Sequence, residues 1–194
     1  MPPRTGPGSR PGGRTASVTA KVNRAVLDLI VEGGAGACTY AQVAKRSGID
    51  RSTLYRRYPD RWEMMIDAFM ARAADVVPDL QGNFAVDLKL VLTRLIEILE
   101  SPLGPALLSL AGELRAAHAG DYSRAYFDRR MVQLDPMFDA AIARGELPAE
   151  VDREELFTFA AGAIYFRLFI AARAIDDAWL DSLVEKVCWL YCSA

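Results

Sequence analysis

The chain has 194 residues, of which 52% are hydrophobic and 25% charged, so it is not a disordered protein and can form one large or two small domains. Its formal net charge of −2 hides an asymmetry: residues 1–62 carry eleven Lys and Arg against four acidic residues, whereas residues 63–194 carry twelve against twenty-one. A net charge of +7 followed by one of −9 indicates a polyanion-binding head on a body with another role, unless the charges are scattered by chance.

Residues 1–16 are predicted to form a flexible basic arm, because they combine four Pro and four Gly with three Arg. The arm lacks the apolar stretch of a signal peptide, and the three cysteines need no oxidising compartment, so we expect a cytoplasmic protein. Arg4, Arg10 and Arg14 would either enter a minor groove of DNA or only raise non-specific affinity for it.

From residue 17 onward, apolar residues recur at helical spacing almost to the end of the chain. The first helix is expected to stop at the Gly33–Gly34 pair, and its apolar face consists of Val18, Val22, Val26, Leu29 and Ile30. Further helices are expected over residues 40–47, 51–58, 62–77, 84–100, 105–119, 121–144, 152–175 and 177–192. Pro136 should kink or split the helix over residues 121–144. No alternating pattern predicts a strand, so the fold class is all-α with about nine helices.

The longest apolar stretch runs from Leu156 to Ile175, about the length needed to span a bilayer. Arg167 and Arg173 interrupt it, and a charge at the centre of a bilayer is costly. We therefore expect a helix buried between protein layers and no membrane contact.

The segment from Thr39 to Pro59 has the spacing of a helix-turn-helix, reading TYAQVAKRSGIDRSTLYRRYP. Ala44 is small where two helices would cross, and Gly48 suits a turn that needs a positive φ. Apolar residues that would pin the pair to the first helix are Val43, Ile49 and Leu54.

Capping residues support the same helix boundaries. Thr39 and Gln42 match a capping box, Asp50 is placed to cap the next helix, and Asp60 begins a second capping arrangement. The second helix of the pair then turns polar and basic groups outward, a pattern that an ordinary helical hairpin with an exposed Arg-rich face would share. These groups are Arg51, Ser52, Thr53, Arg56 and Arg57.

These motifs resemble the DNA-binding signature of TetR-family transcriptional regulators. The matching pieces are TYAQVA at 39–44, SGI at 47–49, TLYRRY at 53–58, PDR at 59–61 and Glu63. The resemblance covers about 45 residues from Val18, with Cys38 where the family often has Thr and Arg61 where it usually has Lys. It implies a helix-turn-helix domain over residues 17–62 and a helical ligand-binding and dimerisation domain over residues 63–194.

A recognition helix presents its N-terminal side chains to base edges in the major groove. The predicted base or near-base contacts are Arg51, Ser52 and Thr53. Arg56 and Arg57 would either read guanine or bind phosphate.

Other residues of the head are expected near backbone phosphate. The resemblance implies this role for Tyr55 and Arg61, and for Thr39 and Tyr40 at the start of the second helix. Lys45 and Arg46 are either phosphate neighbours or a solvated pair. Leu54 and Tyr58 should point into the core.

One head reads too few base pairs to be selective, so we expect a homodimer on a palindromic operator in duplex DNA. Two helices from each subunit would form a four-helix interface, with small residues at 160–163 allowing close approach, unless the apolar stripes only fill the subunit's own core. The stripes are Leu156, Phe159, Ile164, Leu168 and Ala171 in one helix, and Leu180, Leu183, Val184, Val187 and Leu190 in the next.

The resemblance also implies a small-molecule effector, bound in the second domain and signalling through the helix over residues 62–77. Candidate lining residues are apolar and aromatic, which suggests a largely apolar ligand, although such residues more often belong to a core. They are Met65, Phe69, Leu95, Leu99, Leu110, Leu114, His118, Tyr126, Phe127, Met131 and Phe159. His118 could instead offset the dipole of its helix.

No catalytic motif is present, and the single histidine limits catalytic triads, so we expect neither an enzyme nor a cofactor. Cys188 and Cys192 could form a metal pair across a dimer, but they lack His partners and fit better as buried small residues. The predicted function is a sequence-specific DNA-binding regulator, a repressor released by a ligand. The alternative is a helical interaction or ligand-binding module whose helix-turn-helix is vestigial.

Overall fold

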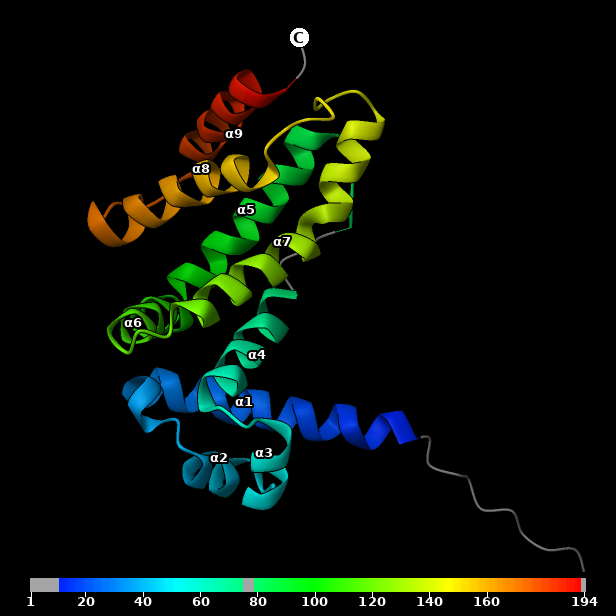
Figure 1. Ribbon diagram of the computed structural model, residues 1–194. Helices are drawn as coiled ribbons and strands as arrows, with labels where there is room; N and C mark the ends of the chain where they lie inside the picture. The colour runs from blue at the N-terminus through cyan, green and yellow to red at the C-terminus, as the bar shows by residue number, and fades with distance from the viewer. Residues whose placement is uncertain (1–10, 75–78, 193–194) are drawn as a thin grey trace, which may run out of the picture. The chain divides into compact units, whose positions relative to one another are not determined.

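The computed structural model describes residues 11–74 and 79–192 and contains, within them, nine α-helices, one π-helical turn and no strand (Figure 1). The prediction of an all-α fold is confirmed. The chain divides into two compact units at Phe69 and Met70, a few residues later than the predicted boundary at 62 and 63. The division therefore falls inside α4 (Arg61–Ala74).

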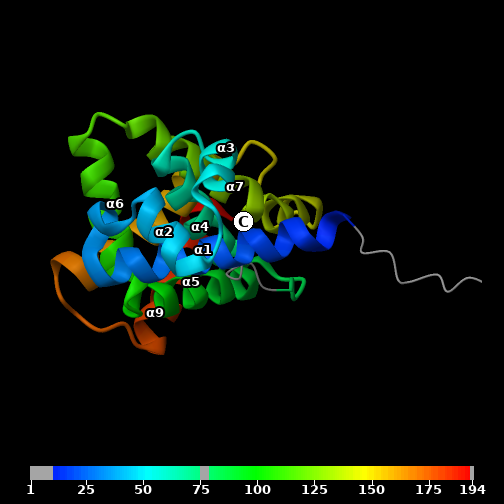
Figure 2. The same ribbon diagram turned by 90° about the horizontal axis from the view of Figure 1, so that it is seen from below.

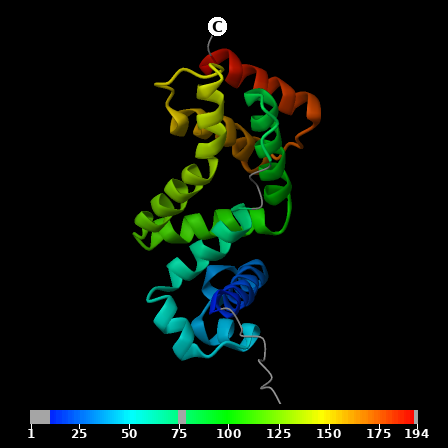
Figure 3. The ribbon, with the colours of Figure 1, turned by 90° about the vertical axis from the view of Figure 1, so that its right-hand side faces the viewer.

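The first unit is built on α1 (Pro11–Ala37), which packs against α2 (Tyr40–Ser47), and α2 in turn packs against α3 (Arg51–Arg57). Figure 2 shows these three helices from below, and in Figure 3 α1 is seen end-on, down its axis. The predicted apolar face of α1 forms the core of this unit, with Val18 half-buried at its edge and four buried residues. The four are Val22, Val26, Leu29 and Ile30.

One expectation for this region was wrong. The helix begins at Pro11, where proline is tolerated because a first-turn N–H has no helical partner, so residues 11–16 are helical rather than part of a flexible arm. The expected break at Gly33–Gly34 is present, since both residues have a non-helical backbone with Gly34 at φ 71°, and a short helical stretch follows the break to Ala37. Arg4 and Arg10 lie outside the described residues, as does the side chain of Arg14.

The second unit is arranged around α5 (Phe84–Glu100), which packs against the four α-helices that follow it in the chain (Figure 1). These helices are α6 (Leu103–Ala116), α7 (Gly120–Ala143), α8 (Arg153–Tyr165) and α9 (Asp177–Tyr191). Leu88 and Leu92 of α5 meet Phe138, Leu156 and Leu183 from three neighbouring helices in one buried cluster. This core holds the C-terminal helices in place.

Helix α7 stays in one piece although Pro136 lies inside it. Proline removes one hydrogen bond of the helix, and α7 bends along its length rather than splitting (Figure 1).

Helix α8 ends earlier than predicted. It passes at Phe166–Ile170 into a π-helical turn, η1, and the chain is then irregular as far as Asp176. Ala172 takes a positive φ of 49°, and Arg167 Nε donates to the carbonyl of Ala174 at 2.9 Å, which folds the chain back toward α9. No Pro or Gly marks this break, so the pattern of the sequence did not reveal it.

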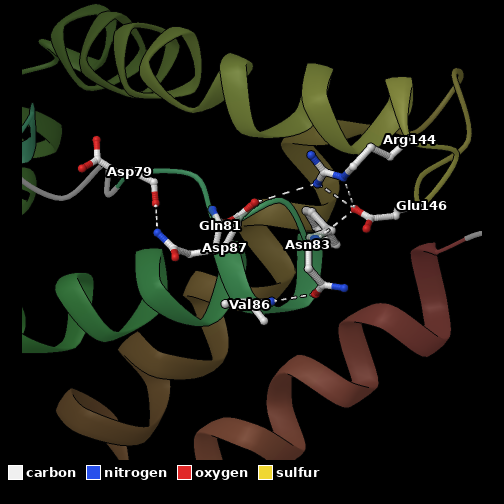
Figure 4. A network of polar contacts seen from close by, with 8 residues as sticks. Asp79, Gln81, Asn83, Val86, Asp87, Arg144 and Glu146 are labelled. Carbon is white, nitrogen blue, oxygen red and sulfur yellow. Dashed lines mark hydrogen bonds and ion pairs between the residues drawn. The ribbon is translucent and has the colours of Figure 1, made fainter.

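A polar network fixes the start of α5 (Figure 4). Asn83 Oδ1 accepts from the N–H of Val86 at 3.1 Å, and Glu146 Oε2 accepts from the N–H of Phe84 at 2.9 Å. Arg144 Nη2 lies 2.7 Å from the same Glu146 oxygen and 3.9 Å from the buried carboxylate of Asp87. The hydrogen bond from Arg144 lowers the pKa of Glu146, so the turn after α7 is tied to α5 by ionised groups.

Among the described residues, no single helix has both the length and the apolar character to cross a membrane. Only α5 and α6 taken together would pass on length and composition, and they bend by 83° at their junction.

Candidate nucleic-acid interface

The turn between α2 and α3 has the geometry that the sequence predicted. Thr39 caps α2, with its Oγ1 accepting from the N–H of Gln42 at 3.3 Å. Gly48 takes a left-handed φ of 70° and donates its N–H to the carbonyl of Ala44 at 3.0 Å, which closes α2 and starts the turn. Asp50 occupies the N-cap position of α3 but makes no side-chain hydrogen bond there, contrary to the expectation.

The inner side of the motif is apolar. Val43 and Leu54 are buried, Tyr58 is also buried, and Ile49 is half-buried. The predicted orientation of Leu54 and Tyr58 is therefore confirmed. Because these residues face inward, the opposite side of α3 must face solvent.

That outer side carries the predicted contact residues. Arg51, Ser52, Arg56 and Arg57 are exposed, Tyr55 retains 47% of its surface, and Thr53 is half-buried. Thr39 and Lys45 are exposed at the two ends of α2, and Tyr40 and Arg61 are half-buried. The motif thus brings ten predicted side chains onto or beside two short helices that project polar and cationic groups.

A tyrosine pair, which the sequence did not reveal, stiffens this surface. The rings of Tyr40 and Tyr55 stack with centroids 4.1 Å apart, and Tyr40 Oη donates to the carbonyl of Tyr58 at 2.6 Å. Arg51 Nη2 donates to Tyr55 Oη at 3.2 Å. Burial raises the pKa of Tyr40 above its ordinary value of 10.0, so its hydroxyl remains a donor at neutral pH. Helices α2 and α3 are therefore joined across their outer surface.

Several cations of the head already have partners. Arg46 makes a forked pair with Glu32 of α1, with both N–O distances at 2.6 Å, and this hydrogen bond lowers the pKa of Glu32. The guanidinium of Arg61 lies 4.3 Å from the ring centroid of Trp62, and Asp60 Oδ1 accepts from the N–H of Trp62 at 2.8 Å, which caps α4. Arg46 is thus exposed, as one of its two predicted roles requires, but it is paired with α1, which the sequence did not predict.

The predicted ligand-lining residues fall into three groups by exposure. Met65, Phe69, Leu99, Leu110 and Leu114 are buried, whereas Leu95, Tyr126, Phe127 and Met131 are half-buried. Phe159 is 42% exposed, and His118 is exposed at the end of α6 with a positive φ of 55°. None of these residues lines the open hollow of about 690 Å³ beside η1. That hollow is lined by Ala163, Phe166, Arg167, Ala171, Arg173 and Trp179.

The last two helices divide their apolar residues between core and surface. Leu156 and Ile164 of α8 and four residues of α9 are buried inside the second unit, so much of each predicted stripe fills the unit's own core. The four are Leu180, Leu183, Val184 and Val187. A second set of large apolar residues on α8, η1 and α9 is exposed instead, each with 42% to 84% of its surface accessible to solvent. This set, the C-terminal apolar face, is Phe159, Phe166, Ile170, Trp189 and Leu190.

Cys188 and Cys192 are half-buried and hydrogen-bonded to each other rather than fully buried as expected. Burial is the main cause that raises the pKa of both thiols, that of Cys192 to about 12. Neither thiol is ionised at neutral pH.

Comparison with known proteins extends this picture to both units. The family model of the tetracyclin repressor-like C-terminal domain matches residues 77–187. The chain is 29% identical over 164 residues to the HTH-type transcriptional regulator YdeS of Bacillus subtilis, covering 82% of each protein. It is 27% identical over 161 residues to the HTH-type transcriptional regulator AqdR of Rhodococcus erythropolis, covering 81% of this chain and 77% of that one.

Among solved structures, a TetR family transcription regulator, SCO0332, superimposes with a TM-score of 0.73 at 28% identity, over 91% of this chain and all of the other. The TetR transcriptional regulator SCO0520 of Streptomyces coelicolor gives a TM-score of 0.54 at 26% identity, over 91% of this chain and 99% of the other.

Proposed function

The chain belongs to the TetR family of transcriptional regulators, and from this premise we propose that it is a repressor that holds a palindromic operator as a homodimer and releases it when a small, largely apolar ligand binds. Regulators of this family bind operator DNA and act as dimers, and they are not enzymes. The observation that carries the proposal is the exposed polar face of α3 opposite buried Leu54 and Tyr58.

On this proposal the head divides into base-reading and phosphate-binding residues. Arg51, Ser52 and Thr53 lie in the first turn of α3, the part that reaches base edges when a recognition helix enters the major groove. Arg56 and Arg57 follow one turn later, as guanine readers or phosphate contacts. Phosphate contacts are proposed for the side chains of Thr39, Lys45, Tyr55 and Arg61, which flank that helix. For Tyr40 the proposed donor is the backbone N–H at the start of α2, because its hydroxyl already donates to the carbonyl of Tyr58.

The Tyr40–Tyr55 stack supports the phosphate assignment of Tyr55. Its hydroxyl accepts a hydrogen bond from Arg51, which leaves its own proton for another acceptor. With 47% of the residue exposed, that proton can reach a phosphate oxygen without any rearrangement of α3.

We place the homodimer contact on the C-terminal apolar face. Trp189 is 84% and Ile170 72% exposed, and large apolar side chains with so much surface in water are suited to burial against a partner subunit. An isologous contact through this face would bury it twice, once from each protomer.

The ligand is proposed to bind within the second unit, where Leu95, Phe127 and Met131 are half-buried against the apolar core and Tyr126 is also half-buried. Because α4 runs through the boundary between the two units, a shift of its last turn would be carried along one continuous helix toward the head.

The proposal is tested by selecting operator fragments from genomic DNA with the full-length protein and measuring affinity at several salt concentrations. We expect binding to the selected site to exceed binding to random duplex by about 10³ or more, with a steep loss of affinity as salt rises. Arg56→Ala should abolish operator binding without changing the dimer or the melting temperature. Tyr55→Ala should also abolish operator binding and keep the dimer and the fold, but its melting temperature should fall because the stack on Tyr40 is lost.

The matched control is Arg124→Ala, which changes an exposed arginine on α7. This variant should bind the operator like the wild type. Equal affinity for selected and random DNA, or unchanged operator affinity in both head variants, would favour a vestigial helix-turn-helix instead.

A further inference from the structure

Arg130 is a charged residue enclosed in the second unit. It lies on α7, and only 5% of its surface is exposed. Burial lowers the pKa of its guanidinium, the direction expected when a charge loses solvent. Arginine is almost never fully buried unless it is paired, so the identity of its partner matters.

The partners of Arg130 among the described residues are neutral. Nη1 donates to the carbonyl of Ala73 and to Oε1 of Gln133, both at the long distance of 3.3 Å. Nη2 is buried and has no hydrogen-bond partner within residues 15–74 and 79–192. No ion pair within those residues includes Arg130, whereas Arg144 and Arg153 of the same unit each bind carboxylates. The guanidinium therefore lacks a counter-charge in the part of the chain that the structure describes.

The groups around Arg130 are aromatic. Its guanidinium carbon lies 5.9 Å from the ring centroid of Phe157 on α8. Tyr126, one turn earlier on α7, and Tyr165 on α8 both interact with it electrostatically. Burial raises the pKa of both phenols, so they are neutral at physiological pH and do not balance the positive charge. One cation and two phenol hydroxyls are thus brought together beside the ring of Phe157.

We propose that Arg130 is the anion-binding group of the effector site, and that the effector carries one carboxylate on an apolar or aromatic body. The proposal rests on the proposed function and adds the chemical class of its ligand. A monoanionic carboxylate matches one guanidinium, whereas a phosphate dianion would need further cations. The aromatic groups at 126, 157 and 165 would contact the rest of the molecule.

The same geometry links the ligand to α4. Ala73, whose carbonyl accepts from Nη1, lies in the last turn of that helix. A carboxylate bound at Nη2 would draw the rigid guanidinium fork toward itself, and Nη1 moves with it because the group is planar. Occupancy of the site would therefore change the hydrogen bond at the end of α4.

The test measures ligand binding by calorimetry on full-length protein without DNA. The probes are octanoate and 4-phenylbutyrate, each compared with its matched alcohol, 1-octanol and 4-phenylbutanol. We expect at least one acid to bind about tenfold or more tightly than its alcohol. Arg130→Met, which keeps the length of the side chain and removes its charge, should lose this preference. Arg130→Lys should retain part of it, and Arg124→Met on the exposed side of α7 should retain all of it.

A purely structural role is separated from ligand binding by the unfolding midpoint in urea. Removing an uncompensated buried charge should leave the unliganded Arg130→Met variant at least as stable as the wild type, whereas removing a structural arginine should lower its midpoint. The proposal is overturned if both acids bind no better than their alcohols, if the preference survives in Arg130→Met, or if that variant is clearly less stable.

A second measurement, of operator binding, distinguishes a failure of the role proposed for Arg130 from a failure of the proposed function. Arg130→Met should bind the operator like the wild type but no longer release it on addition of the acid. If the wild-type protein binds no operator at all, the proposed function fails, while the acid preference measured without DNA still decides the role of Arg130.

Discussion

Replacing Trp189 by alanine tests the proposed dimer face most directly. Trp189 lies near the end of α9 with 84% of its surface exposed. A tryptophan buries about 150–250 Å² when it is covered. The exposed share, at about 25 cal/mol per Å², gives roughly 3–5 kcal/mol of apolar stabilisation if a partner subunit covers it. Association costs reduce this upper bound to about 2 kcal/mol or more for each tryptophan, a typical value for an interface hot spot.

A two-fold interface contains Trp189 twice, so the Trp189→Ala dimer should lose about 4 kcal/mol, which weakens its dissociation constant nearly a thousandfold. Sedimentation equilibrium measures this constant, and the melting temperature at low protein concentration shows that the monomer stays folded. Val132→Ala is the matched control, because Val132 is 67% exposed on α7 and lies outside the C-terminal apolar face. A Trp189→Ala dissociation constant within threefold of the wild type, or an equal loss in Val132→Ala, would refute the assignment of the interface.

Three further predictions concern the first unit. Tyr40→Phe removes the donor to the carbonyl of Tyr58 and should lower the free energy of unfolding by about 1 kcal/mol, read from the urea midpoint; an unchanged midpoint would mean that water replaces the bond. Gly48→Ala meets no atom within 4 Å but must keep a φ of 70°, so it should cost about 1 kcal/mol in the same assay, and a gain in stability would contradict this. Glu32 has a lowered pKa, so its pair with Arg46 stabilises the fold above the ordinary value of 4.5 and stops doing so as the pH falls through the lowered value. Melting temperatures of Glu32→Gln and wild type should therefore differ slightly at pH 7 and converge once the pH falls below the lowered pKa, and a constant difference would argue against the ionic contribution.

The helix-turn-helix could be predicted from the sequence because its determinants are local. The cap at Thr39, the positive φ of Gly48 and the inward spacing of Val43 and Leu54 each act over a few residues, and each is found where the pattern placed it. The forked pair of Arg46 escaped the same reasoning, because its partner Glu32 lies on another helix and only the packing of α1 against α2 brings them together.

The second unit was harder to predict for two physical reasons. The end of α8 has no local breaker, since the π-helical turn and the positive φ at Ala172 arise where the chain must turn back toward α9. The burial of Arg130 also has no signal in the pattern, because a charged residue between Arg129 and Met131 reads as part of a solvated helix face. Tertiary packing alone distinguishes it from Arg129, which is exposed.

The contacts of Tyr40 bear on the thermodynamics of operator recognition. Its ring against Tyr55 and its hydroxyl on the backbone of Tyr58 hold the two short helices in register before any partner arrives. A head that is already rigid has little conformational entropy left to lose when it docks, so coupled folding should contribute little to the heat-capacity change of association. Discrimination between sequences would then come from the fit of a preformed surface, and DNA that cannot adapt to it would be rejected.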